Sequence, residues 1–403
     1  MALSFLAAPE WTRTALLEAG TETFGRRRRF LDAVVSSVLR GYSHKPADRP
    51  NELAGFIAAH LPARVPARIV SRRVVPTRTV RMRWDTPVLD DLAALADFLE
   101  LDGDRLDWFA DRRELNRKTR CEPLRHYRYT WMGRRLIEAP KPLLRDLQRR
   151  LLDEVLGRVP VHPAAHGFVP GRSVHTFTAP HAGQRVVVRL DLAQFFPSIS
   201  VRRVYGLFRS IGYPEPVAHT LAALCTTSTP FDVARGSIFL RTPHLPQGAP
   251  TSPALANLCT FRLDRRLAGL ALSFGAEYTR YADDLAFSGS FEASGLVRAV
   301  SEIAADEGFR VHPAKTRVRG RGDQQRLAGL VVNERPGVAR AEYDRLRAIL
   351  HAAARDGLEV ANRDGHPDFR NHLLGRIAWV GHGRPARAAK LRELYRAAAA
   401  TGL

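Results

Sequence analysis

The first 60 residues carry their apolar side chains at the spacing of an α-helix. The clearest set recurs every three or four residues: Leu31, Val34, Val35 and Val38. That repeat places the side chains on one helical face. Between residues 62 and 87 the chain changes to proline, valine and arginine, which predicts an extended basic linker or a short edge strand. We therefore expect residues 1–90 to form a helical N-terminal extension that includes this linker.

Further along the chain the pattern becomes mixed. Between about residues 125 and 335, helical spacing such as that of 143–156 alternates with short apolar runs such as 186–188. Short runs of β-branched residues are typical of buried strands. After Asn333 the helical spacing resumes. The pattern predicts an α+β fold whose last 70 residues form a small helical domain.

Composition and charge narrow the class of protein. The 403 residues are 45% hydrophobic and 26% charged, the values of a folded protein rather than of a disordered chain. The 62 Lys and Arg outnumber the 41 Asp and Glu, which gives a net charge of +21, and only five of the cations are Lys. Such a surplus favours a polyanionic partner, with nucleic acid first, because phosphate contacts release condensed counterions. For the arginines between Arg64 and Arg83, a solvated surface is an equal alternative.

Cysteine usage and hydropathy exclude several classes. Cys121, Cys225 and Cys259 stand far apart and in no paired spacing, which argues against a disulfide framework or a zinc ribbon. No run of about 18 apolar residues occurs, and the first residues lack the basic start of a secretory signal. We expect a cytoplasmic protein without a membrane partner.

Candidate chemistry centres on three carboxylates. Asp191 ends the apolar run that predicts a strand, and 92 residues later Asp283 and Asp284 occupy a turn between two β-prone arms. Adjacent acids become favourable beside a divalent cation, and hard oxygen ligands suit Mg²⁺. Two such ions held by Asp191 and Asp283 would serve an in-line nucleotidyl transfer. Taken singly, each signal has a structural alternative, because an Asp pair is often a solvated turn and a strand-end Asp is often a helix cap.

The order of the motifs adds weight that no single motif has. The strand-end Asp191 is followed by two Phe, Leu245-Pro-Gln-Gly comes next, and Tyr281-Ala-Asp-Asp follows. From about His126 to the C-terminus the chain resembles the reverse transcriptase family. The resemblance implies a right-hand polymerase that copies an RNA template into DNA from deoxynucleoside triphosphates. We expect fingers at 91–185, a palm at 186–333 and a helical thumb at 334–403.

The resemblance also implies roles for residues at the reacting end of the primer. Asp191 and Asp283 match the metal-binding aspartates, and Asp284 matches a carboxylate with less direct metal contact. Tyr281 would lie under the primer terminus. Phe196 matches the steric gate, where an aromatic ring occupies the space of a ribose 2′-hydroxyl.

Other residues match positions that contact the incoming nucleotide or the template. Gln247 and Gly248 match the nucleotide-contacting loop, where glycine permits close backbone approach. Arg135 matches the cation that grips the triphosphate, and Arg172 matches a template or phosphate contact. Lys315 fits the residue that protonates the departing pyrophosphate. For Arg135 and Lys315 an ordinary surface residue is the structural alternative.

Within the family the chain looks most like bacterial retron-type enzymes. Similar segments are 127–148, 165–173, 195–199 and 329–333. Two segments depart from the motifs that retron enzymes usually carry. Of the motif Asn-Ala-x-x-His, the segment Phe177-Thr-Ala-Pro-His181 keeps only the His. In place of Val-Thr-Gly, this chain has Leu327-Ala-Gly. Since about 70 residues follow the palm, we expect a thumb without an RNase H domain or a metal-binding endonuclease.

Retron membership would imply a cognate structured RNA that serves as both template and primer. Synthesis would begin at a guanosine 2′-hydroxyl and give RNA-linked DNA, with defence against phage as the expected biology, and the question of an effector protein stays open. Thumb arginines are candidates for RNA contacts: Arg370, Arg376, Arg384, Arg387 and Arg392. Two alternatives stay open: a non-retron bacterial reverse transcriptase, either intron-derived or defence-associated, and a non-catalytic RNA-binding scaffold.

Overall fold

The computed structural model describes residues 1–62, 69–71 and 75–400. Part of the predicted basic linker, at 63–68 and 72–74, lies outside the described residues, and the described stretch 75–87 contains no strand. The chain divides into two compact units, each made from two separate stretches. The first comprises Met1–Val161 and Phe196–Cys259, and the second comprises His162–Phe195 and Thr260–Leu403.

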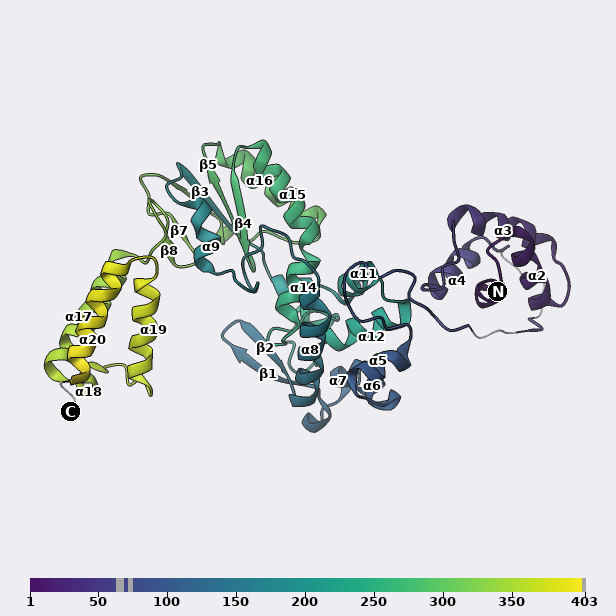
Figure 1. Cartoon of the computed structure of the whole chain (residues 1–403), viewed down its shortest axis with the longest axis horizontal. Helices are drawn as coiled ribbons and strands as arrows, with labels where there is room; N and C mark the ends of the chain where they lie inside the picture. The colour runs from purple at the N-terminus through teal and green to yellow at the C-terminus, as the bar shows by residue number, and fades with distance from the viewer. Residues whose placement is uncertain (63–68, 72–74, 401–403) are drawn as a thin grey trace. The chain divides into compact units, whose positions relative to one another are not determined.

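The first unit begins with a bundle of helices at the N-terminal end, coloured purple in Figure 1. Its helices are α1 (Ala2–Ala7), α2 (Arg13–Phe24), α3 (Arg29–Gly41) and α4 (Pro50–Ala59). The four apolar residues predicted to share a face of α3 are all fully buried, and Val34, Val35 and Val38 belong to the bundle core. Thr12 caps the start of α2, and Gly25 ends it with a positive φ of 69°. The helical N-terminal extension is therefore built on the expected amphipathic faces.

The rest of the first unit combines helices with one hairpin. Its helices are α5 (Leu92–Leu99), α6 (Gly103–Ala110), α7 (Leu115–Lys118), α8 (Pro142–Glu154), α11 (Val201–Ile211), α12 (Glu215–Cys225), α13 (Ile238–Arg241) and α14 (Ser252–Cys259). The hairpin pairs β1 (Tyr127–Met132) with β2 (Arg135–Pro140). Short 3₁₀ turns lie at Glu122–Leu124 and Leu156–Arg158.

One buried carboxylate ties the N-terminal bundle to α12. Glu215 accepts hydrogen bonds from the backbone N–H groups of Asn51 and Glu52, at 2.7 and 2.9 Å. These groups belong to the first turn of α4, where a negative charge satisfies unpaired donors and the helix dipole. Arg209 of α11 adds an ion pair with Asp48 at 2.9 Å.

The second unit is built on an antiparallel sheet with strand order β4-β5-β3-β6 (Figure 1). The strands are β3 (Val186–Asp191), β4 (Glu277–Tyr281), β5 (Asp284–Gly289) and β6 (Arg317–Gly320). Helices α15 (Phe261–Ser273) and α16 (Ala293–Asp306) contact β4 and β3. Phe177 of α9 (Val174–Thr178) packs with Val187 and Ala286 on the sheet.

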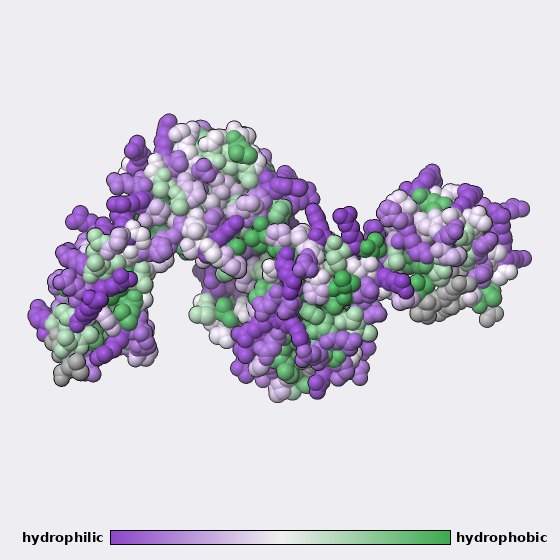
Figure 2. Space-filling view, viewed as in Figure 1, coloured by the Kyte–Doolittle hydropathy of each residue, from purple (hydrophilic) through white to green (hydrophobic). Residues whose placement is uncertain are grey.

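The second unit continues into the C-terminal helices. A short pair, β7 (Arg326–Leu327) with β8 (Leu330–Val331), precedes them. They are α17 (Arg340–Asp356), α18 (Leu358–Ala361), α19 (Phe369–Gly381) and α20 (Pro385–Ala400), and they share one buried apolar core. Further 3₁₀ turns lie at Ala179–His181 and Pro313–Lys315, and α10 (Phe195–Ser198) lies where the chain passes between the units. Hydrophilic side chains cover much of the face shown in Figure 2.

These elements confirm the α+β class and the predicted strands and helices. The run 186–188 lies in β3, the stretch 143–156 lies mostly in α8, and the last 70 residues contain the predicted helices. The division into fingers, palm and thumb, with its boundaries, stays a prediction.

We predict that Glu215→Ala weakens the attachment of α4. Two hydrogen bonds to a buried carboxylate are lost, so the opening free energy of the α4 amides should fall by about 2 kcal/mol. Hydrogen exchange measures this directly. Glu302→Ala, a change at an exposed site on α16, is the matched control and should leave α4 unaffected. Equal protection of α4 in both variants would show that Glu215 has no such role.

Candidate active site

The register of two neighbouring strands brings the three predicted carboxylates together. Asp191 is the last residue of β3 and pairs with Asp284, the first residue of β5. The next residue, Leu192, donates its backbone N–H to the carbonyl oxygen of Asp283 at 2.9 Å. Residues paired in this way have Cα atoms about 5 Å apart. The strand-end acid and the turn acids thus share one end of the sheet.

The turn that carries Asp283 is tight and has an unusual backbone. Tyr281 pairs with Asp284, so only Ala282 and Asp283 lie between the strands. Ala282 has a φ of +54°, which a residue with a Cβ adopts only when its surroundings hold it there.

Two side-chain cations neutralise this acidic cluster. The Arg189 guanidinium donates to both carboxylate oxygens of Asp284, at 2.9 and 3.0 Å. Lys315 Nζ contacts both oxygens of Asp191, at 3.0 and 2.9 Å. Burial raises the pKa of Asp284, the charges of Asp283 and Asp191 raise it further, and Arg189 opposes the increase. Acids this close require a compensating positive charge.

The donor chemistry of the cluster suits a hard divalent cation. Asp191 is 5% exposed, and its oxygens are of the kind that Mg²⁺ prefers. Among the residues that the structure describes, no three His, Cys, Asp or Glu side chains are arranged to hold a metal as they stand. Lys315 and Arg189 supply positive charge to Asp191 and Asp284.

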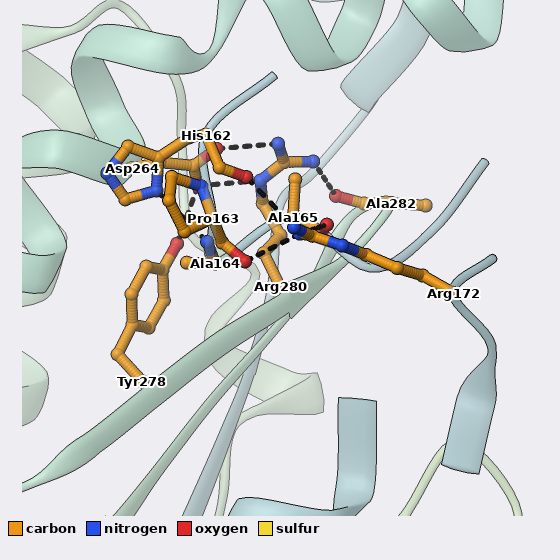
Figure 3. Close-up of polar contacts among 9 residues, drawn as sticks. All are labelled: His162, Pro163, Ala164, Ala165, Arg172, Asp264, Tyr278, Arg280 and Ala282. Atoms are coloured by element: carbon orange, nitrogen blue, oxygen red, sulfur yellow. Dashed lines mark hydrogen bonds and ion pairs between the residues drawn. The ribbon is translucent and has the colours of Figure 1, made fainter. Parts of the chain in front are cut away.

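A second ion pair, which is fully buried, contacts the backbone of the turn (Figure 3). Arg280 donates to both oxygens of Asp264 at 2.7 Å, and the Tyr278 hydroxyl donates to the same carboxylate at 2.8 Å. The remaining Arg280 nitrogen donates to the Ala282 carbonyl oxygen at 3.0 Å. This network therefore joins α15 to the strained residue of the turn. No residue pattern predicts this pairing, although Arg280 directly precedes the Tyr281-Ala-Asp-Asp motif.

Arg172 has backbone partners in the structure. Its Nη1 donates to the carbonyl oxygens of Pro163 and Ala165, at 2.6 and 2.5 Å (Figure 3). The predicted template or phosphate contact is thus also a clamp on its own loop. Its role toward nucleic acid stays a prediction.

Within the first unit, the predicted nucleotide-contacting residues lie on the hairpin and the loop beside it. The Glu138 N–H donates to the Gln247 carbonyl oxygen at 2.7 Å. Gly248 has a φ of +130°, and a Cβ there would lie 3.2 Å from the Glu138 carbonyl oxygen, so only glycine fits easily. Arg135 is exposed at the start of β2.

A buried acid anchors this loop to β2. Glu138 lies 2.9 Å from His244 Nε2 and accepts from the Thr229 hydroxyl at 2.6 Å. All three side chains are buried. Sequence reasoning missed this network, because its members are about 100 residues apart and belong to no motif. Phe196, the predicted gate, is half-buried in α10.

Comparison with known proteins identifies the family. The family described as reverse transcriptase (RNA-dependent DNA polymerase) matches residues 132–329. Retron Mx65 reverse transcriptase of Myxococcus xanthus is 49% identical over 265 residues, which cover 64% of this chain and 60% of that protein. Retron Mx162 reverse transcriptase of the same organism is 39% identical over 360 residues, 81% of this chain and 72% of that protein. The chain belongs to the retron reverse transcriptases.

Other matches are more distant. Retron Ec86 reverse transcriptase of Escherichia coli is 34% identical over 221 residues, 54% of this chain and 64% of that protein. This chain thus spans between 60% and 72% of the length of these three relatives. The structure of a telomerase from Candida albicans is similar over 52% of this chain and 40% of the telomerase chain, at 8% identity. Its TM-score of 0.32 is too low to support an argument.

The predicted family is therefore confirmed, including its retron type. In this retron reverse transcriptase, each helix of the described part of the chain is too short or too polar to cross a bilayer.

This retron reverse transcriptase retains only the His of the Asn-Ala-x-x-His motif, and that residue, His181, contacts two strands of the sheet. His181 is fully buried, with Nδ1 2.6 Å from Ser288 Oγ and Nε2 2.8 Å from Thr279 Oγ1. It thereby links the Ala179–His181 turn to β4 and β5. Burial lowers the pKa of His181 to about 3, with a smaller contribution from His166.

We predict that protonation of His181 contributes to acid unfolding. Its folded-state pKa lies below the ordinary value near 6.5, so its contribution is complete above pH 6.5 and declines as the pH falls toward 3. From pH 6.5 to 4.5 the wild type should lose about 2 kcal/mol more stability than His181→Gln. Urea unfolding at each pH measures the two slopes. His351→Gln, at an exposed site, should keep the wild-type slope, and identical slopes in all three proteins would exclude the role of His181.

Proposed function

We propose that this retron reverse transcriptase is an RNA-directed DNA polymerase whose chemistry takes place at the Asp191, Asp283 and Asp284 cluster. The pairing of Asp191 with Asp284 is the observation that carries the proposal. It gathers acids from two distant motifs at one sheet end, in the order that the family shares. Carboxylates gathered in this way are suited to a divalent cation, and nucleotidyl transfer supplies a reason to place one there.

In this proposal Asp191 and Asp283 hold two Mg²⁺ ions, and Asp284 supports them while Arg189 balances its charge. When bound, the ions would activate the attacking hydroxyl and stabilise the leaving oxygen. The Lys315 Nζ lies 3.0 Å from Asp191 and its side chain is 55% exposed, a position from which it would donate a proton to the departing pyrophosphate.

Other side chains select and hold the substrate. Gln247 and Gly248 form the loop that contacts the incoming deoxynucleotide, while Arg135 binds its triphosphate. Phe196 excludes a ribose 2′-hydroxyl. Tyr281 lies under the primer terminus, and Arg172 contacts the template strand or its phosphates in addition to clamping its loop.

We further propose a right-hand polymerase with fingers at 91–185, palm at 186–333 and thumb at 334–403, preceded by the 1–90 extension. Its partner is a cognate structured RNA that is both template and primer, with synthesis from a guanosine 2′-hydroxyl in the cytoplasm. The net charge of +21 supports phosphate contacts. Defence against phage is the biology we assign to the RNA-linked DNA.

The central test replaces the turn acids. Asp283→Asn with Asp284→Asn should reduce Mg²⁺-dependent deoxynucleotide incorporation on an RNA template by about a thousandfold, since charge stabilisation of the reacting phosphate is lost. Affinity for the RNA should change little. Primer-extension rates and filter binding provide the two measurements.

The matched control is a second Asp pair in the same chain. Asp91 caps α5 by accepting from Ala94 N–H, and its neighbour Asp90 accepts from Thr79 N–H. Asn caps a helix about as well as Asp, so Asp90→Asn with Asp91→Asn should keep full activity. Persistent incorporation in the Asp283/Asp284 variant would refute the metal assignment, and no incorporation by the wild type would favour the non-catalytic scaffold.

A separate prediction concerns sugar selection. Phe196→Val opens the space of the 2′-hydroxyl, so preference for deoxynucleotides over ribonucleotides should fall about tenfold or more. The ratio of kcat/KM for the two nucleotides measures it, with deoxynucleotide incorporation as the internal control. An unchanged ratio removes the gate role from Phe196.

A further inference from the structure

The loop at 162–172 extends the sheet beside the catalytic turn. Ala165 forms a parallel bridge with Arg280 of β4. Arg280 N–H donates to the Ala164 carbonyl oxygen, and His166 N–H donates to the Arg280 carbonyl oxygen, both at 2.7 Å. Figure 3 shows Ala164 and Ala165 of the loop beside the buried Arg280 side chain. The loop is therefore fixed to the strand that leads into Asp283.

Gly167 brings the loop backbone against the turn itself. A Cβ at this position would lie 2.7 Å from the backbone nitrogen of Ala282 and 3.4 Å from the Cα of Tyr281. Atoms do not approach this closely, so a side chain here would displace the turn. The loop therefore packs directly against the turn, and this packing fixes the position of the next residue, Phe168.

That next residue is Phe168, an aromatic side chain in a costly backbone conformation. Its φ is +61°, a region that bulky residues rarely adopt and that costs on the order of 1 kcal/mol or more. The side chain is nevertheless 48% exposed, and its ring centroid lies 6.3 Å from that of Tyr281. A core-packing role does not explain a strained, half-exposed ring.

Contacts on both sides hold Phe168 in place. On its C-terminal side, Arg172 clamps the Pro163 and Ala165 carbonyl oxygens. On its N-terminal side, His166 Nδ1 lies 2.9 Å from Thr176 Oγ1. A single exposed Phe needs no explanation on an ordinary surface. Here three features occur together: the strained backbone of Phe168, the Arg172 clamp on its loop and the neighbouring Tyr281 ring. Tyr281 is two residues before Asp283 in the sequence.

We propose that Phe168, held beside Tyr281, stacks on a nucleobase of the bound nucleic acid. Stacking suits a polymerase because every base has a π-face, so contact does not depend on sequence. The ligand is a base at the growing end, contributed either by the primer or by the template. This assignment of Phe168 rests on the proposed polymerase function.

The experiment uses the full chain with an RNA template annealed to a DNA primer. Phe168→Ala should raise the Kd for this duplex about tenfold, the usual loss of one stacked base. Phe168→Trp should restore binding, whereas Phe168→Leu should resemble the Ala variant because it keeps apolar volume without a π-face. Wild-type binding by Phe168→Leu, or by Phe168→Ala, overturns the proposal.

Controls separate stacking from folding. Phe231→Ala removes a Phe that is 63% exposed in the first unit and should bind like the wild type. Thermal unfolding of every variant should match, since Ala, Leu and Trp share the same backbone strain. A loss of binding that follows a loss of thermal stability counts against stacking.

Abasic substitutions identify which base is stacked. If the primer-terminal base is the partner, an abasic primer end should weaken wild-type binding as much as Phe168→Ala does, and the two changes together should add little. If the template base is the partner, an abasic template gives that result instead. Full additivity with both abasic duplexes overturns the proposal. Absence of incorporation by the wild type would instead count against the polymerase function, which separates the two failures.

Discussion

The antiparallel register between β3 and β5 is the constraint on which the site depends. It places Asp191 opposite Asp284, although like charges directly opposite on neighbouring strands are destabilising. The chain offsets this repulsion with Arg189 and Lys315, one on the same strand and one at the end of a short 3₁₀ turn. A shift by one residue would turn Asp191 toward the other face of the sheet. The pairing of β3 with β5 thus sets both the position of these acids and the balance of their charges.

Buried polar side chains hold the turn that carries Asp283 in one conformation. A buried ion pair such as Arg280 with Asp264 contributes little net stability, because desolvation offsets much of the attraction. Breaking one partner, however, leaves an unpaired charge in the interior. Since Arg280 also holds the carbonyl oxygen of Ala282, such a pair fixes one arrangement of the turn. Beside the Gln247 loop, buried Glu138 contacts His244 and Thr229 and ties this loop to β2.

Local features of the fold were predictable from the sequence, because they follow from spacing along the chain. Residues at helical spacing in α3 are buried, the run that ends at Asp191 is a strand, and Asp283 lies in a hairpin turn. The convergence of the acids was also predicted, although by resemblance between ordered motifs rather than by spacing.

Partners across the fold could not be predicted in the same way. Arg189 and Asp284 are 95 residues apart, and His181 and Ser288 are 107 apart. Such pairs are decided by strand register and loop packing, which a residue pattern does not encode. The backbone role of Arg172 was hidden for another reason, because arginine is abundant in this chain and one guanidinium looks like another in sequence.

The direct measurement of the central claim is metal binding rather than turnover. Mn²⁺ titration followed by electron paramagnetic resonance, with template, primer and a non-hydrolysable deoxynucleotide present, counts bound ions and their affinities. Our prediction is two bound ions in the wild type and the loss of at least one in Asp191→Asn. Wild-type stoichiometry and affinity in Asp191→Asn would contradict it.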